Sequence, residues 1–275
     1  MNGREGDAVT ATLKLAQLAS GSRRLADLLT EGQNSVRGDP ANAKRRVTLF
    51  QLMVLSGQWD RALTQLYVVK EMDADANDFV RTYREVVRCE LFRKEVFAGG
   101  KTPLVLGEPQ EWIAKLTEAV RLLGEGKAAE AAQLRAAAFE AAPAVPGSLN
   151  GEPFEWIADA DVRLGPVCEA MLNGKYYWIP FERLARIEVE APSDLRDLIW
   201  APAKLTFQNG GEQVAFLPAR YPGSEASEDD DIRLCRKTEW RDLGADTHVG
   251  MGQRMFATNV GETAILEARV IELNR

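Results

Sequence analysis

The chain has 275 residues, of which 45% are apolar and 27% charged, a composition that excludes disordered and fibrous proteins and leaves room for two domains. No stretch approaches the roughly 18 uncharged apolar residues of a membrane span, and the N-terminus lacks the features of a signal peptide, so we expect a cytosolic protein with no membrane partner. Residues 1–150 carry 20 basic and 19 acidic side chains, whereas residues 151–275 carry 14 and 22; the acidic second half repels phosphate backbones, and we expect no nucleic-acid partner.

Two helices joined by a tight turn are predicted between residues 47 and 70. Apolar residues recur there with helical spacing on both sides of Ser56 and Gly57. The same arrangement, a turn glycine followed by a small alanine, returns at Gly126 and Ala131. Such spacing, with a period of about 34 residues, is typical of tetratricopeptide-like repeats, in which each helix pair packs on the next. A plain helical bundle is the alternative.

A longer helix is predicted over residues 75–97, because it carries inward-facing apolar residues and is followed by two glycines. Residues 98–110 are then expected to form a loop or an insertion. The Pro/Gly/Ser-rich stretch 141–153 cannot continue a helix and marks a boundary. We therefore predict a TPR-like α-helical repeat domain over residues 1–147 and a mainly antiparallel β domain with short helices over residues 148–275.

The second half is predicted to consist mainly of antiparallel strands. Asn173-Gly174, the dipeptide most favoured in two-residue type I′ turns, separates two apolar-rich runs and predicts a hairpin. Alternating apolar and polar residues predict further strands. The expected strands cover residues 168–172 and 175–179, 203–207 and 213–217, 186–190, and 263–273, with short helices at 181–185 and 193–198.

Asp159 and Asp161 form the most chemically suggestive pair in the chain. Their carboxylates could bind a hard cation or act as an acid–base couple, which would make the protein an enzyme whose acidic site includes Arg163 and Tyr176. His248 is the only histidine and the three cysteines are scattered, so we assign no catalytic residue, cofactor or metal. The simpler interpretation is that the carboxylates order a turn and pair with Arg163.

Four of the six tryptophans and three of the five tyrosines lie in the second half, where they either fill the core or anchor a protein partner. The acidic stretch 224–231 (SEASEDDD) is expected to be a solvated loop, or else to attract a basic partner electrostatically. A scaffold that dimerises through exposed Trp or Tyr residues is a further interpretation. The candidate partner-binding residues are Trp156, Asp159, Asp161, Arg163, Tyr176, Tyr177, Trp200, Arg220, Tyr221 and Trp240.

Stacked helix pairs form a concave surface that typically receives a peptide or a helix. Because few repeats are present, the predicted ligand is a single helix of roughly three to five turns. The residues alone therefore favour a protein-binding adaptor.

A series of motifs across both halves resembles the ImpE/SciE family, also called TagJ, of accessory proteins in bacterial type VI secretion. The motifs keep their order along almost the whole chain, which makes the series more specific than any single repeat signature. They lie at residues 57–63 (GQWDRAL), 83–99, 102–109 (TPLVLGEP), 150–151, 154–161 (FEWIADAD), 163–166 (RLGP), 173–181, 196–200, 220–225 (RYPGSE), 238–240 and 252–254.

The resemblance implies a non-enzymatic cytosolic protein that acts on the contractile sheath of the secretion machine and on sheath recycling. Proteins of this kind are associated with the N-terminal helix of the small sheath subunit, TssB or VipA, and with the AAA+ ATPase ClpV. The family supplies no catalytic residue to carry over, and no short motif assigns its helix-binding contacts.

Overall fold

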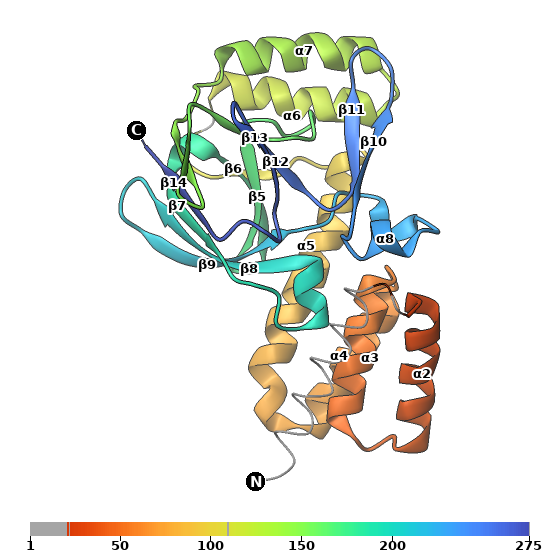
Figure 1. The fold of residues 1–275 in the computed structure, drawn as a ribbon. Helices are drawn as coiled ribbons and strands as arrows, with labels where there is room; N and C mark the ends of the chain where they lie inside the picture. The colour runs from red at the N-terminus through yellow and green to blue at the C-terminus, as the bar shows by residue number, and fades with distance from the viewer. Residues whose placement is uncertain (1–20, 22, 109, 275) are drawn as a thin grey trace.

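The computed structural model describes residues 21, 23–108 and 110–274; the predicted absence of a signal peptide concerns residues outside these ranges. Helices occupy the first part of the chain and strands the second, as the sequence predicts (Figure 1). Within the described ranges, no helix is long and apolar enough to cross a membrane. The helices are α2 (Leu25–Gly38), α3 (Ala43–Leu55), α4 (Trp59–Met72), α5 (Asn77–Phe97), α6 (Glu111–Gly124), α7 (Ala128–Ala141) and the short α8 (Asp230–Arg233).

The two predicted helical hairpins, α3–α4 and α6–α7, are built on the same kind of turn. Gly57 and Gly126 both adopt the left-handed conformation, with φ of 69° and 79°, which a residue with a Cβ adopts only with strain. Ala62 and Ala131 are buried at 0% and 1% exposure, where a small side chain lets helices approach closely. In Figure 1, however, α2–α4 lie at one end of the molecule and α6–α7 at the other. The hairpins therefore do not stack on each other, and a tetratricopeptide-like array is not confirmed.

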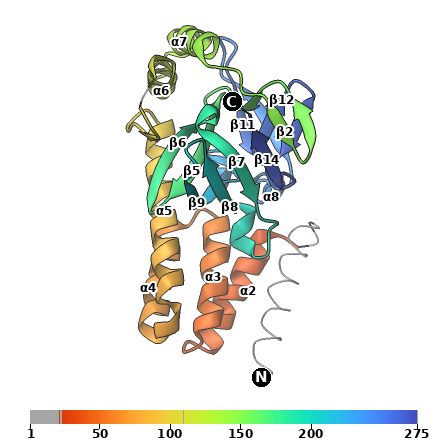
Figure 2. The same cartoon turned by 90° about the vertical axis from the view of Figure 1, so that its left-hand side faces the viewer.

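Helix α5 runs between the two helical groups and alongside the sheet (Figures 1 and 2). A 3₁₀ turn at Ala74–Ala76 precedes it, so the predicted long helix is confirmed with a later α-helical start. Val86 and Val96 on its inner side belong to the same hydrophobic cluster as Trp178 of the sheet. The helical and β parts thus share one core, and their division into two domains stays a prediction.

A nine-stranded sheet dominates the β part, in the order β1-β6-β5-β9-β8-β7-β14-β2-β3. Neighbouring strands are antiparallel except β1 and β6, and β1 comes from the segment predicted as a loop or insertion. Two smaller sheets, β10-β11 and β13-β12-β4, complete the β part. The strands are β1 (Leu104–Val105), β2 (Gly147–Leu149), β3 (Glu152–Phe154), β4 (Ile157–Asp159), β5 (Val167–Leu172), β6 (Lys175–Pro180), β7 (Leu184–Val189), β8 (Trp200–Phe207), β9 (Glu212–Pro218), β10 (Thr238–Asp242), β11 (His248–Gly252), β12 (Met255–Thr258), β13 (Gly261–Ala264) and β14 (Val270–Leu273).

Turn chemistry accounts for the predicted hairpins. Asn173 and Gly174, with φ of 48° and 72°, join β5 to β6 as a type I′ turn requires. The strands predicted at 203–207 and 213–217 pair as β8 and β9. The single strand predicted over residues 263–273 is wrong: the chain turns where the N–H of Ala268 bonds the carbonyl of Ala264, and β13 and β14 join different sheets. The predicted short helices are 3₁₀ helices at Phe181–Arg183 and Leu195–Leu198.

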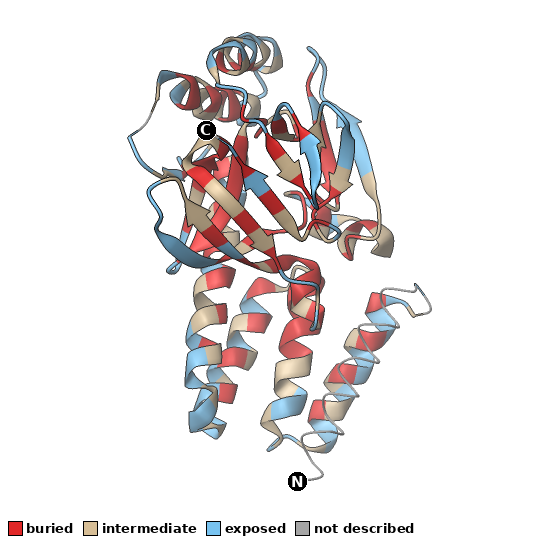
Figure 3. Ribbon diagram, turned by 60° about the vertical axis from the view of Figure 1, so that its left-hand side comes forward, coloured by how far each residue is buried: buried red, intermediate tan, exposed pale blue. Residues whose placement is uncertain are grey.

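Strand β5 is buried on both faces. Val167 and Met171 belong to the cluster that includes the helices, whereas Cys168 and Ala170 belong to a second cluster on the other face of the sheet. Glu169 lies between Val167 and Met171, so its carboxylate enters an otherwise apolar layer. Figure 3 shows that buried residues run through these strands and along the inner faces of the helices. A charge at this depth requires a partner.

Candidate functional site

A buried ion-pair cluster, defined by Arg93, Asp159, Glu169 and Arg254, lies where α5 meets the sheets. Arg93 of α5 donates two hydrogen bonds to Glu169, from Nε at 2.7 Å and from Nη2 at 3.0 Å. Arg254, which precedes β12, pairs with Glu169 and with Asp159 at the end of β4. All four side chains are at most 3% exposed. Because the two guanidinium groups face two carboxylates, the cluster ties the helix to both sheets without an unpaired buried charge.

The two carboxyl groups of the cluster respond differently to burial. Burial by itself raises the pKa of Glu169, but the charges of Arg93 and Arg254 outweigh it and lower that pKa to about 2. At Asp159 burial dominates and raises the pKa to about 6, because the charge of Arg254 only partly offsets it. Glu169 therefore stays ionised through the whole physiological range, whereas Asp159 takes up a proton in mild acid.

The shift at Asp159 predicts a pH dependence of stability. The pKa of an aspartate is about 3.9 in an unfolded chain and that of Asp159 is about 6 in the folded protein, so its contribution is fully present below about pH 4 and is lost as the pH rises through about 6. We expect the free energy of unfolding of the wild type, relative to that of an Asp159→Asn variant, to fall over this interval. Urea titrations at several pH values measure this difference; a constant or rising difference would contradict the expectation.

Two of the candidate tyrosines complete the cluster. Tyr176 donates its hydroxyl hydrogen to Glu169 and accepts a hydrogen bond from Nε1 of Trp178 at 2.7 Å. Tyr221 donates to Asp159 at 3.1 Å. Both tyrosine rings are buried. Their hydroxyl groups therefore satisfy interior carboxylates.

Asp161 orders a turn and pairs with Arg163, as the simpler interpretation of the sequence predicts. Its Oδ1 accepts hydrogen bonds from the backbone N–H and from Nε of Arg163, both at 2.9 Å, and its Oδ2 accepts one from the N–H of Gly250 at 2.9 Å. The Arg163 guanidinium lies 4.8 Å from the centre of the Phe97 ring. In the part of the chain that the structure describes, no group of three or more His, Cys, Asp or Glu side chains is arranged to hold a metal ion.

The structure divides the ten candidate partner-binding residues into two groups. Trp156 and Trp240 are each 39% exposed, and Arg163 and Tyr177 are partly exposed, so partner binding by these four stays a prediction. The others are packed inside the protein, where their side chains cannot reach a partner, because they fill the core or bond its polar groups. These buried residues are Asp159, Asp161, Tyr176, Trp200, Arg220 and Tyr221.

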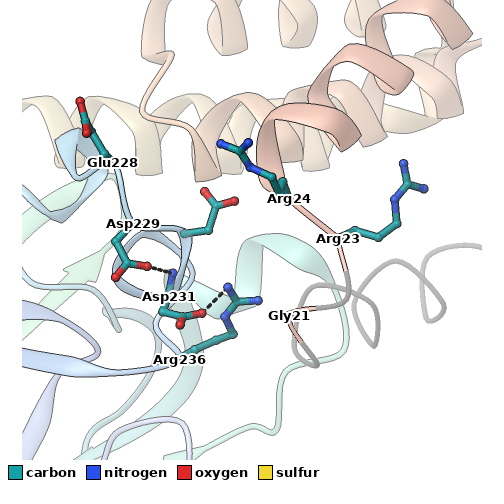
Figure 4. Close-up of a pocket in the computed structure, with 8 residues that line it drawn as sticks. Gly21, Arg23, Arg24, Glu228, Asp229, Asp231 and Arg236 are labelled. Carbon is teal, nitrogen blue, oxygen red and sulfur yellow. Dashed lines mark hydrogen bonds and ion pairs between the residues drawn. The ribbon is translucent and has the colours of Figure 1, made fainter.

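The acidic stretch 224–231 is folded against the start of α2. Asp230 accepts a hydrogen bond from the N–H of Leu25 at 2.8 Å and so caps a helix whose own N-cap residue offers no side-chain bond. Asp231 pairs with Arg236, and the neighbouring pocket of about 490 Å³ mixes both signs of charge (Figure 4). Much of the acidic charge is thus compensated within the chain. The pocket is lined by Gly21, Arg23, Arg24, Glu228, Asp229, Asp230, Asp231 and Arg236.

A groove, which we call the α2–α4 groove, runs over helices α2, α3 and α4. Leu49 and Met53 of α3 form its apolar floor, at 3% and 2% exposure. Arg37 of α2 and Arg61 of α4 are exposed at its sides. The groove encloses about 260 Å³, and its other lining residues are Gln33, Thr64 and Gln65. An apolar floor between two cations suits an amphipathic segment with carboxylates along its edges.

Sequence reasoning missed the central residues of both features. Arg93 lies among the buried residues of α5 with Cys89 and Val96, and Glu169 lies on an inward face of an apolar strand. A charged residue in a buried stripe is the signal that could have revealed the cluster. The groove residues carry no comparable signal, because Arg, Gln and Thr are common on any exposed helix surface.

The fold and the buried ion-pair cluster together define a helical–β scaffold in which the charges of that cluster neutralise one another. A family model described as "ImpE protein" matches residues 151–272. A protein of Pseudomonas aeruginosa described as "Type VI secretion system accessory component TagJ" is 52% identical over 249 residues, which cover 90% of this chain and 87% of that protein. The chain therefore belongs to the ImpE/TagJ family of type VI secretion accessory proteins, as its motifs indicate.

The fold is also seen in a solved structure. The crystal structure of protein VPA1032 from Vibrio parahaemolyticus is similar, with a TM-score of 0.86 over 94% of this chain and 97% of that chain. Because the two sequences are 21% identical, the similarity establishes a common fold and no more.

Proposed function

We propose that this protein is a non-enzymatic cytosolic adaptor of a type VI secretion system that binds the N-terminal helix of the small sheath subunit TssB/VipA. The observation that carries the proposal is the α2–α4 groove, together with membership of the ImpE/TagJ family. A sheath helix bound in this groove is kept near the ATPase ClpV, or it is prevented from pairing too early with another segment of the sheath. The adaptor thereby assists sheath disassembly by position, without forming a covalent bond.

The α2–α4 groove supports a helical ligand through both its shape and its charge. Leu49 and Met53 make its floor apolar, but they are only 3% and 2% exposed, so the apolar contact that they offer an amphipathic helix is small. Arg37 and Arg61 come from different helices, so a helix lying between them meets a cation on each side.

An enzyme centred on Asp159 and Asp161 receives no support from the geometry. Asp159 is bonded to Arg254 and Tyr221, and Asp161 to Arg163 and a backbone N–H. Both carboxylates are fully engaged and at most 1% exposed, so a substrate has no route to them in this conformation. An ordering role for both residues is the better account.

Binding of a sheath-derived helix can be tested at the groove itself. We expect a peptide of the TssB/VipA N-terminal helix to bind the wild type, and an Arg37→Glu/Arg61→Glu double variant to bind it at least about tenfold more weakly, because two attractions become repulsions. Isothermal titration calorimetry or fluorescence anisotropy with a labelled peptide measures the affinities. Both arginines are exposed, so the substitutions should leave the fold intact.

A matched control is Arg81→Glu. Arg81 is also an exposed arginine of the helical part, but it lines a different pocket, between α5 and β9. Its replacement should change the peptide affinity by less than about twofold. If the wild type ignores the peptide at tens of micromolar, the helix-binding proposal fails; if the double variant binds as well as the wild type, the groove assignment fails.

A further inference from the structure

The outer edge of strand β10 is an unpaired and exposed strand edge. β10 is hydrogen-bonded only to β11 among the described strands, and the β10–β11 hairpin stands at the margin of the β part in Figure 1. From Glu239 to Asp242 every residue is exposed. An open edge of this kind is a template for pairing with another strand.

The hydrogen-bond register identifies which backbone groups face outward. The N–H of Leu243 bonds the carbonyl of Thr247, and the N–H of Gln253 bonds the carbonyl of Lys237, so odd-numbered residues of β10 direct their backbone groups to β11. Since the direction alternates along an antiparallel strand, the backbone groups of Thr238, Trp240 and Asp242 point away from the hairpin.

We propose that this edge pairs with β10 of a second copy of the protein, antiparallel and with the twofold axis at Trp240. In that register Trp240 exchanges two backbone hydrogen bonds with the partner's Trp240. At each end, Thr238 of one copy exchanges two more with Asp242 of the other copy. The two hairpins then form one continuous four-stranded sheet. The interface is isologous, as a closed dimer requires.

The charges of β10 favour this register and favour a second copy of the chain as the partner strand. With the axis at Trp240, Glu239 faces Arg241 of the other copy, and Arg241 faces its Glu239, so two ion pairs form at once. Both pairs occupy non-hydrogen-bonded positions, where side chains on neighbouring strands come closest. Glu239 already pairs with Lys237 of its own chain at 2.7 Å, whereas Arg241 has no ion-pair partner among the described residues. Dimerisation therefore gives Glu239 a second cation and Arg241 its first carboxylate.

The side chain of Trp240 fits the same arrangement. Its ring lies 5.8 Å from that of the buried Tyr221, which fixes one face, and 39% of the residue remains exposed. Pairing at the axis places a second Trp240 beside this exposed part. Exposed aromatic area of this kind stabilises an interface when it is covered.

The experiment uses two charge reversals whose mixture restores complementarity. Glu239→Arg alone places arginines opposite each other, and Arg241→Glu alone places glutamates opposite each other, so each variant should dimerise about tenfold more weakly than the wild type. Mixed together, they form a heterodimer in which every facing pair is again one acid and one base. Sedimentation velocity over a micromolar concentration series should therefore show the wild type and the mixture becoming dimeric at concentrations about tenfold lower than each variant alone.

The opposite outcomes overturn the proposal. A wild type that stays monomeric at high micromolar concentration excludes the dimer, and single variants that dimerise like the wild type exclude this edge. A mixture that stays monomeric excludes the proposed register, because it retains both folded partners. Circular dichroism confirms that each variant is folded, and Glu212→Arg on β9 serves as an exposed charge reversal that should leave the dimer unchanged.

Discussion

Replacing Glu169 by glutamine should lower the free energy of unfolding by about 3–5 kcal/mol. The carboxylate accepts bonds from Arg93 and Arg254, both buried, and from the Tyr176 hydroxyl. Glutamine keeps the size of the side chain but removes the charge that both guanidinium groups share. Arg254 is then left with Asp159, and Arg93 with Glu90, which lies 3.1 Å away and is 13% exposed. Urea unfolding followed by tryptophan fluorescence measures the loss.

The matched control is Glu272→Gln on β14. Glu272 also pairs with an arginine, Arg186, but its side chain is 52% exposed. Water solvates both charges when such a pair is broken, so we expect a loss of at most about 1 kcal/mol. Equal effects at Glu169 and Glu272 would show that burial of the cluster does not determine its contribution to stability.

The predictable parts of the fold are those decided by neighbouring residues. Asn173 and Gly174 adopt positive φ because a two-residue hairpin turn demands it, and Gly57 and Gly126 do so at helix ends. At these positions the residue type, Asn or Gly, already indicates that the backbone needs a positive φ. Sheet order is different in kind: β14 lies between β7 and β2, which are distant along the chain. No local pattern records that pairing.

The same distinction explains what was predictable about the site. Asp161 and Arg163 are two residues apart, and their pairing was predictable from that spacing. Arg93 and Glu169 are separated by 76 positions, and only the packing of α5 on β5 brings them together. Aromatic residues are ambiguous for a related reason, because Tyr221 and Trp240 have similar chemistry but different depths in the fold.

The position of α5 also changes the expected binding surface. A regular stack of helix pairs would extend one concave surface over all helices. Here α5 leaves the first group and packs along the sheet, and α6–α7 begin at the far end (Figure 1). The groove is therefore limited to α2–α4, and the β10 edge belongs to a different part of the molecule. Loss of helix binding and loss of dimerisation should consequently be separable by mutation.

Replacing Gly250 by alanine should destabilise the protein by about 3 kcal/mol, the upper end of the usual cost of overpacking. An added Cβ would lie 2.3 Å from two carbons of the Tyr221 ring, well inside contact distance. The ring cannot move freely, because its hydroxyl bonds Asp159 at 3.1 Å and accepts a bond from the N–H of Met255 at 3.0 Å. Relief of the clash must therefore disturb the buried ion-pair cluster or shift β11.

Gly38→Ala is the comparison that isolates this clash. Gly38 ends α2, and an added Cβ there meets no atom within 4 Å. Since alanine also favours the helix, that variant should be neutral or more stable by up to about 1 kcal/mol. Thermal unfolding compares the two variants, and the near-ultraviolet circular dichroism of Gly250→Ala should change because Tyr221 packs against Trp240. If Gly250→Ala unfolds like Gly38→Ala with an unchanged aromatic spectrum, the tight approach of β11 to Tyr221 is not a constraint on the fold.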